Sequence, residues 1–199
     1  MNRKQQKEYT KRQIFDTSIS LFIENGYENV SIDGIVKKIG LTKGAFYHHF
    51  LSKDAIMLEY CNKALDSFTD NLLQTIQFYK EKNITDIFEY LFENISRFLI
   101  ENYGMINVII TQSKKANIAL EELFLNETAR IFSNLLTMGL TKKEFDLSLS
   151  HESLGKYIST LLFFKIKEIV LEKKKQEDTS KEIRDIYKLL VHGIFFKTT

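Results

Sequence analysis

The chain has 199 residues and a formal net charge of +2, and its apolar (44%) and charged (27%) fractions exclude a largely disordered chain. It has no proline, so few helix breaks are forced and long helices are favoured. A lone Cys61 excludes an intrachain disulfide, and the charged start "MNRKQQKEYTKRQ" lacks the apolar segment of a signal peptide. We therefore expect a cytoplasmic protein that is not inserted in a membrane.

Positive charge is concentrated at the start of the chain. Residues 1–53 hold nine Lys/Arg and five Asp/Glu, whereas the remainder holds nineteen and twenty-one. A basic segment joined to a near-neutral body indicates that the segment meets a polyanion.

Glycines and capping residues divide the first fifty residues into three helices. The first is expected over residues 6–25, with Gly26 as its end. The second begins at the N-cap Ser31 and carries apolar residues at helical spacing. Gly40 ends it, and Thr42 caps a short third helix that reaches about residue 50. Two helices separated by a tight glycine-containing turn indicate a helix-turn-helix.

The rest of the chain also has helical spacing. Ser52 caps a long amphipathic helix, and further helices are expected near 84–101, 103–113, 117–138, 150–173 and 179–196. The prediction is an all-α protein. Residues 1–53 are expected to form a small N-terminal head of three helices that contains the helix-turn-helix, and residues 54–199 a larger C-terminal helical bundle.

The third helix has an unusual outward face. At about 100° per residue, Phe46 points inward, and Phe50 and Thr42 lie within about 40° of it on the buried side. Gly44 and His48 then point outward, flanked by Ala45 and Tyr47. Small residues allow close approach and Tyr and His supply donors, as a helix entering the DNA major groove requires. The alternative is a surface helix that only happens to carry aromatic residues.

Residues 9–56 resemble the N-terminal domain of the tetracycline-repressor (TetR) family of bacterial regulators. The resemblance rests on "IFDTSISLFIENGYENVSIDGIVKKIGLTKGAFYHHFLSKDAI" and covers about a quarter of the chain. Within it, Phe-x-x-x-Gly-Tyr ends the first helix, and Gly-Leu-Thr-Lys-Gly-x-x-Tyr-x-His-Phe spans the turn and the third helix. The family has alanine where Ser18 and Gly34 stand and often proline where Leu51 stands.

The resemblance implies a homodimer in which residues 1–53 are the helix-turn-helix DNA-binding domain and residues 54–199 are the ligand-binding and dimerisation domain. It also implies that the dimer binds a palindromic double-stranded DNA operator and represses transcription until a small ligand binds the C-terminal domain. Carried over residue by residue, it implies the following DNA contacts: Ser31, Thr42 and Tyr47 to phosphates, Lys43, Gly44, Ala45 and His48 toward the groove, and Lys53 to the backbone at the start of the fourth helix.

The last two helices carry broad apolar stripes. Such stripes ordinarily form a protein's own core, but the resemblance implies a four-helix interface with a second subunit. The residues assigned to that interface are Leu154, Ile158, Leu161, Leu162, Ile183, Ile186, Tyr187, Leu190, Val191 and Ile194.

Aromatic residues are frequent in the central helices. If they enclosed a cavity it would suit a small hydrophobic effector, and otherwise they fill the core. The residues assigned to the ligand site are Cys61, Leu65, Phe68, Phe88, Phe92, Phe132 and Phe163.

Other functions find less support in the sequence. We see no Gly-rich phosphate loop, no metal-spaced ligands and no catalytic triad, so we expect neither an enzyme nor a cofactor. Adjacent His48 and His49 point about 100° apart on a helix, which disfavours a shared metal ion. Two alternatives keep the DNA-binding domain. The bundle could bind a partner protein in place of a ligand, or the protein could activate transcription.

Overall fold

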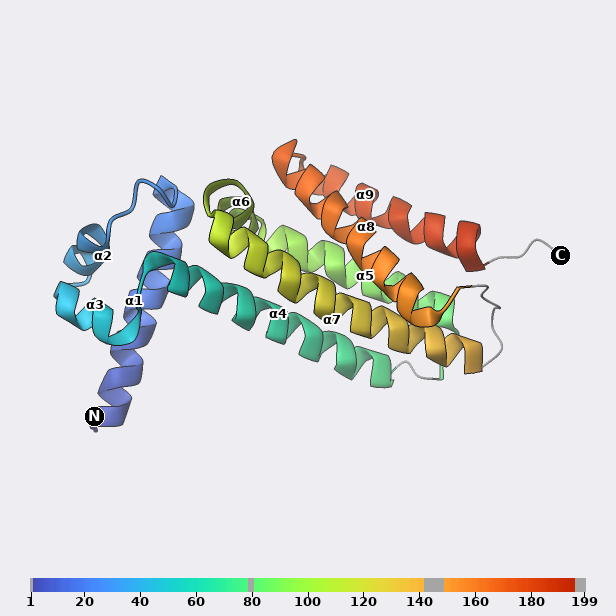
Figure 1. The fold of residues 1–199 in the computed structure, drawn as a ribbon, viewed down its shortest axis with the longest axis horizontal. Coiled ribbons are helices and arrows are strands. Elements are labelled where there is room, and N and C mark those ends of the chain that lie inside the picture. The colour runs from blue at the N-terminus through green and yellow to red at the C-terminus, as the bar shows by residue number, and fades with distance from the viewer. Residues whose placement is uncertain (1, 79–80, 142–148, 196–199) are drawn as a thin grey trace. The chain divides into compact units, whose positions relative to one another are not determined.

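The computed structural model describes residues 2–78, 81–141 and 149–195, and these residues form helices with no strand among them (Figure 1). The helices are α1 (Arg3–Asn25), α2 (Ile32–Lys38), α3 (Lys43–His49), α4 (Lys53–Phe78), α5 (Ile84–Glu101), α6 (Tyr103–Gln112), α7 (Lys114–Thr141), α8 (His151–Leu171) and α9 (Gln176–Leu190), and a π-helical turn, η1 (Val191–Phe195), follows α9. The predicted all-α class is confirmed. In the described part of the chain, no helix is long and apolar enough to cross a bilayer.

The chain divides into two compact units. The first comprises Met1–Lys63 and Gly104–Leu120, and the second comprises Ala64–Tyr103 and Glu121–Thr199. The first unit therefore contains the three-helix segment expected at residues 1–53, the start of α4, nearly all of α6 and the start of α7.

Capping residues and two glycines set the boundaries of α1, α2 and α3. The Ser31 hydroxyl accepts a hydrogen bond from the Gly34 amide at 3.0 Å, and the Thr42 hydroxyl accepts one from the Ala45 amide at 3.2 Å. Gly26 (φ 80°) follows α1 and Gly40 (φ 68°) lies between α2 and α3, and this left-handed conformation favours glycine. These caps and stops are the ones that the sequence predicted.

Buried apolar side chains hold the three-helix segment together. Ile14 and Phe22 of α1, Ile35 of α2 and Phe46 of α3 have no exposed surface. Burying side chains of this size stabilises by about 1.5–3 kcal/mol each. The three helices therefore share one core, which fixes the outward face of α3.

The second unit has a core rich in phenylalanine. The ring centroids of Phe88 and Phe132 lie 5.8 Å apart, and those of Phe92 and Phe132 lie 5.9 Å apart. At Gly155 of α8, an added Cβ would lie 2.9 Å from the Ala129 carbonyl oxygen of α7. Only glycine permits this close approach of α8 to α7.

Three helices begin earlier than predicted. α1 begins at Arg3, not at residue 6, because Asn2 and Gln5 form a capping box in which each side chain bonds the other's backbone amide. α7 begins at Lys114 and α9 at Gln176.

Candidate nucleic-acid interface

The outward face of α3 is exposed as the helical geometry predicted. Gly44 and His48 are exposed, Tyr47 is 52% exposed and Ala45 is half-buried. A Cβ added to Gly44 would meet no atom closer than the Thr42 hydroxyl at 3.7 Å, so the space above Gly44 is open. α3 thus exposes its backbone at Gly44, next to the side chains of Tyr47 and His48, which can donate hydrogen bonds.

One position beside α3 differs from its prediction. Thr42, expected on the buried side, is exposed. Its backbone is extended (φ −98°, ψ 159°) because it is the N-cap, so the 100° rule of the helix does not apply to it. Its hydroxyl oxygen accepts the Ala45 amide, which leaves the hydroxyl proton free to donate outward. Ser31, exposed at the start of α2, has the same geometry with Gly34.

Lys43 carries its charge at the start of α3 and pairs with Asp33 of α2. Its Nζ lies 2.8 Å from an Asp33 carboxylate oxygen, and both side chains are more than half exposed. The hydrogen bond and the charge of Asp33 raise the pKa of the Lys43 ammonium. An exposed pair of this kind is weak in water, so a phosphate can compete with Asp33 for Lys43.

Lys53, which is predicted to contact the DNA backbone, binds carbonyl oxygens of its own chain in this structure. Its Nζ donates to the carbonyl oxygens of Tyr27 and Val30, both at 2.7 Å, and lies 4.2 Å from the centre of the Tyr27 ring. The ammonium therefore ties the start of α4 to the segment between α1 and α2. In this structure its ammonium is directed into the domain.

A polar network continues from this contact. The Tyr27 hydroxyl donates to Asp54 at 2.7 Å, and the Ser113 hydroxyl donates to the same carboxylate oxygen at 3.1 Å. The Tyr27 amide donates to the Gln112 side chain at 2.7 Å. Burial and the Asp54 carboxylate raise the pKa of Tyr27, so its hydroxyl stays protonated and can donate. No sequence pattern links residue 27 to residues 112 and 113, so sequence reasoning does not find this network.

The predicted ligand residues are buried and pack in more than one place. Phe88, Phe92 and Phe132 pack on one another. Phe163 instead packs on Phe124, with the two ring centroids 5.5 Å apart. The remaining members are Cys61, Leu65 and Phe68, which are also buried. Burial raises the pKa of the Cys61 thiol to about 12, which keeps it neutral.

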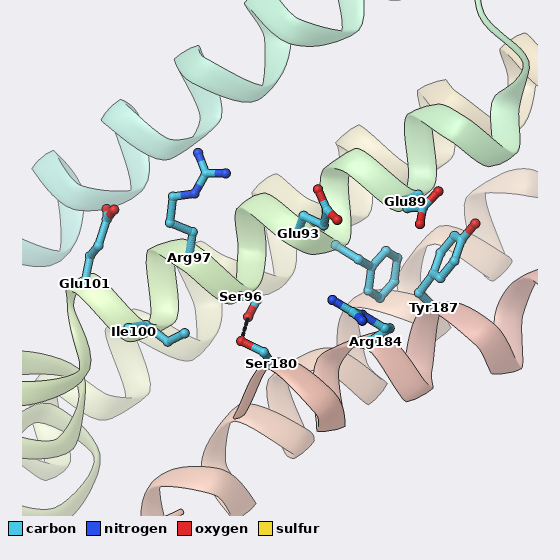
Figure 2. A pocket seen from close by; sticks show the side chains of 10 residues that line it. Glu89, Glu93, Ser96, Arg97, Ile100, Glu101, Ser180, Arg184 and Tyr187 are labelled. Carbon is cyan, nitrogen blue, oxygen red and sulfur yellow. Dashed lines mark hydrogen bonds between the residues drawn. The ribbon is translucent and has the colours of Figure 1, made fainter. Parts of the chain in front are cut away.

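A surface groove of about 470 Å³ lies between α5 and α9 (Figure 2). Phe92 is the predicted ligand residue that lines it, together with Tyr187, whose ring centroid lies 5.9 Å from that of Phe92. The groove also contains Arg97 and Arg184, and the Ser96 and Ser180 hydroxyls form a hydrogen bond at 3.0 Å beside it. Within the described residues, no cluster of three His, Cys, Asp or Glu side chains could hold a metal ion.

Most residues assigned to the dimer interface are buried inside their own chain. Seven of them are at most 5% exposed: Leu154, Ile158, Leu162, Ile183, Ile186, Leu190 and Val191. Tyr187 is half-buried. Leu161 is 39% exposed, and the side chain of Ile194 lies outside the described residues. The amphipathic stripes of α8 and α9 thus form the core of the second unit. A different set on α8 is exposed: Tyr157, Phe164 and Leu171, at 62–63%.

Comparison with known proteins identifies the helix-turn-helix. The family model described as "Bacterial regulatory proteins, tetR family" matches residues 14–60. Residues 14–60 thus carry the DNA-binding domain of the TetR family. The match contains α2, α3 and the first residues of α4, and it includes all the residues predicted to contact DNA.

Curated relatives match a part of the chain. The biofilm operon icaADBC HTH-type negative transcriptional regulator IcaR of Staphylococcus aureus (strain Newman) is 33% identical over 85 residues, which are 43% of this chain and 45% of IcaR. The uncharacterized HTH-type transcriptional regulator YerO of Bacillus subtilis is 45% identical over 51 residues, 26% of this chain and 18% of YerO. The chain therefore matches less than half the length of these relatives.

Solved structures share the TetR fold over nearly the whole chain. The fatty acid degradation regulator FadR from Bacillus halodurans has a TM-score of 0.74 at 18% identity, and the match covers 92% of this chain and 95% of the FadR chain. Thermus thermophilus FadR in complex with lauroyl-CoA has a TM-score of 0.69 at 16% identity, covering 95% and 97%. Bacillus subtilis FadR in complex with stearoyl-CoA has a TM-score of 0.70 at 20% identity, covering 92% and 98%.

Proposed function

We propose that this chain is a sequence-specific regulator of transcription of the TetR family, which binds a palindromic DNA operator as a homodimer and represses from it. The observation that carries the proposal is the outward face of α3. Gly44 admits the close approach of a base pair, and Tyr47 and His48 supply donors at its sides. The similarity to IcaR, a negative transcriptional regulator, supports repression.

Each contact has a role in this proposal. Lys43 exchanges Asp33 for a phosphate, and the free hydroxyl protons of Ser31 and Thr42 donate to phosphate oxygens. Gly44, Ala45 and His48 face the bases, and Tyr47 reaches the backbone. Lys53 acts indirectly, because it holds the segment before α2 against α4.

Selection of bound sequences from a random duplex pool tests the proposal. A dimer with two-fold symmetry should enrich a palindrome whose half-sites follow the helical repeat of DNA. The selected site is then compared with a scrambled duplex at several salt concentrations. Equal affinity for both duplexes would show that α3 does not read sequence.

The homodimer is supported by the exposed apolar stripe of α8. Tyr157, Leu161, Phe164 and Leu171 follow a spacing of four, three and seven residues and so lie on one helical face. Replacing Phe164 with Glu should convert the dimer to a monomer in light scattering at micromolar concentration. Ile118→Glu changes an apolar residue of α7 with similar exposure, 58% against 63% for Phe164, and is the control. A wild-type chain with the mass of one subunit would overturn the dimer.

A small hydrophobic molecule is the proposed effector. The phenylalanine-rich core of the second unit supports this chemistry, and two proteins of the same fold were solved with lauroyl-CoA and stearoyl-CoA. These two acyl-CoAs are the first probes. Each should raise the melting temperature of the chain and release the selected operator. A rise in melting temperature with unchanged operator affinity would mean that the ligand does not regulate DNA binding.

A further inference from the structure

Three basic side chains lie close together at the start of α1. Arg3, Lys4 and Lys7 are exposed, and none of them forms an ion pair with a residue in the described part of the chain. At about 100° per residue, Arg3 and Lys7 are 40° apart and Lys4 lies within about 60° of Lys7. We call these three residues the basic stripe. The next two cations on α1, Lys11 and Arg12, are instead paired with Glu59 and Asp16.

The helix that carries the basic stripe is not held by a core. Residues 2–9 are all exposed, and the first buried residue of α1 is Ile14. The capping box of Asn2 and Gln5, with hydrogen bonds of 2.8 and 2.9 Å, secures this first turn. Capping satisfies amide groups that would otherwise be left open and so resists fraying. The cap therefore presents the cations on an ordered helix and not on a loose tail.

The charges of the basic stripe oppose the preference of a helix start. The first turn of a helix favours acidic side chains because the unpaired amides there carry partial positive charge. α1 has no acidic residue in its first turn and has Arg3 and Lys4 there. Basic residues in the first turn weaken the helix, and Arg3 and Lys4 form no ion pair with a described residue that would compensate. This indicates that their side chains serve another purpose.

The basic stripe lies beside the end of α3. The Lys11 ammonium lies 5.4 Å from the centre of the Phe50 ring, directly after α3. Lys7 lies one helical turn before Lys11 on α1, about 6 Å along the axis. Burial lowers the pKa of His49 at the end of α3, and the charges of His48, Lys7 and Lys11 lower it further. Arg3 is one helical turn further out, about 6 Å along the axis. The stripe thus continues outward from the surface that meets the DNA bases in the proposed function.

We propose that Arg3, Lys4 and Lys7 bind phosphates of the duplex that flanks the base pairs read by α3. This inference rests on the proposed function, since it extends the footprint of α3 along the same DNA. The interactions add affinity and salt dependence without adding sequence preference, because phosphates are common to all sequences. The partner is duplex DNA beyond each half-site.

The test compares the full-length wild type with Lys4→Gln/Lys7→Gln. Glutamine has nearly the helix propensity of lysine, and both residues are exposed, so the variant should fold. The control is Lys114→Gln/Lys115→Gln, which removes two exposed charges from the start of α7 in the same unit. Affinity for the selected operator is measured from about 50 to 200 mM salt, the range over which counterion release is large.

The basic stripe predicts a smaller salt dependence in the variant. The slope of log affinity against log salt should fall by about 0.9 for each phosphate that no longer meets a lysine, or about 1.8 per subunit. The control should keep the wild-type slope. The ratio of affinities for operator and scrambled duplex should stay at its wild-type value, because base readout is intact. An unchanged slope in Lys4→Gln/Lys7→Gln would overturn the inference.

Duplex length supplies a second measurement. Operators with long and short flanks are compared for both proteins. The wild type should bind the long duplex more tightly, whereas Lys4→Gln/Lys7→Gln should lose most of this preference. An equal preference in both proteins would overturn the placement of the stripe on the flanks. If the wild type does not distinguish operator from scrambled DNA, the proposed function itself fails. A specific wild type with an unaffected variant refutes only the basic stripe.

Discussion

Replacing Lys53 with Met separates a positioning role from a DNA contact. Methionine keeps most of the apolar stem but removes the ammonium. The variant therefore cannot form the two hydrogen bonds to the carbonyl oxygens of Tyr27 and Val30, each 2.7 Å long in the wild type. Both carbonyls belong to residues that are at most 8% exposed, so water replaces the missing donor only in part.

The expected loss of stability follows from these interactions. A hydrogen bond to a charged group contributes about 1.5–3 kcal/mol, and partial access of water to the half-buried Lys53 reduces the total for the two bonds to about 2–3 kcal/mol. The Tyr27 ring lies 4.2 Å from the ammonium, and a cation–π attraction at an exposed site contributes about 0.5–1 kcal/mol more. Lys53→Met should therefore lower the free energy of unfolding by about 3 kcal/mol.

Urea unfolding followed by circular dichroism measures this loss, with all proteins at one concentration because unfolding of an oligomer depends on concentration. Lys37→Met is the control, since Lys37 is exposed on α2 and forms no ion pair with a described residue. Its effect should stay within about 0.5 kcal/mol. The reasoning is refuted if Lys53→Met is as stable as Lys37→Met and its operator binding loses about 0.9 in salt slope per subunit.

Three further changes and one labelling experiment test other parts of the structure. Gly155→Ala should destabilise by about 1–3 kcal/mol in urea unfolding, because its Cβ would lie 2.9 Å from α7 backbone atoms. Gly44→Ala should instead raise the melting temperature, since the added methyl group is unobstructed and alanine favours helix by about 1 kcal/mol. The same change should weaken operator binding, and intact affinity would argue against a close approach of DNA to α3. Cys61, 1% exposed with a thiol pKa raised to about 12, should react with a thiol reagent at pH 8 only after the chain unfolds. Burial opposes ionisation of Glu59, but its hydrogen bonds with two lysines outweigh burial and hold its pKa below the ordinary value. That stabilisation is present above the ordinary pKa and disappears as pH falls through the folded value, so Glu59→Gln should flatten the acid limb of the stability profile.

Local signals in the sequence predicted the helix-turn-helix well. Ser31 and Thr42 bond the amides that their positions as N-caps require, and Gly26 and Gly40 have the positive φ expected of helix stops. These features depend on residues within four positions of one another. The inward direction of Phe46 and the outward direction of Gly44 and His48 followed from the same local geometry.

The stripes of α8 and α9 show where such reasoning leaves two outcomes open. An apolar stripe indicates that one face of a helix is buried, but that face can be buried either in the chain's own core or against a second subunit. Ile158 and Leu162 face the core, whereas Phe164, only two residues further along, is 63% exposed. The exposed residues lie among buried ones at a spacing that the sequence alone does not separate.

The polar network in the first unit has a further consequence for how the DNA-binding part is built. Tyr27 and Asp54 bond to Gln112 and Ser113, which lie 85 and 59 residues away in the chain. A Cβ added to Gly104 would lie 3.3 Å from the Ile23 side chain, so α6 also approaches α1 closely. The helix-turn-helix therefore depends on a segment that the chain reaches only after passing through α5. A shift of α6 that breaks the bonds of Gln112 and Ser113 would free Tyr27 and Asp54, whose neighbour Lys53 fixes the segment before α2. The helix-turn-helix is thus tied to the end of α6 by hydrogen bonds within the first unit, none of which involves the outward face of α3.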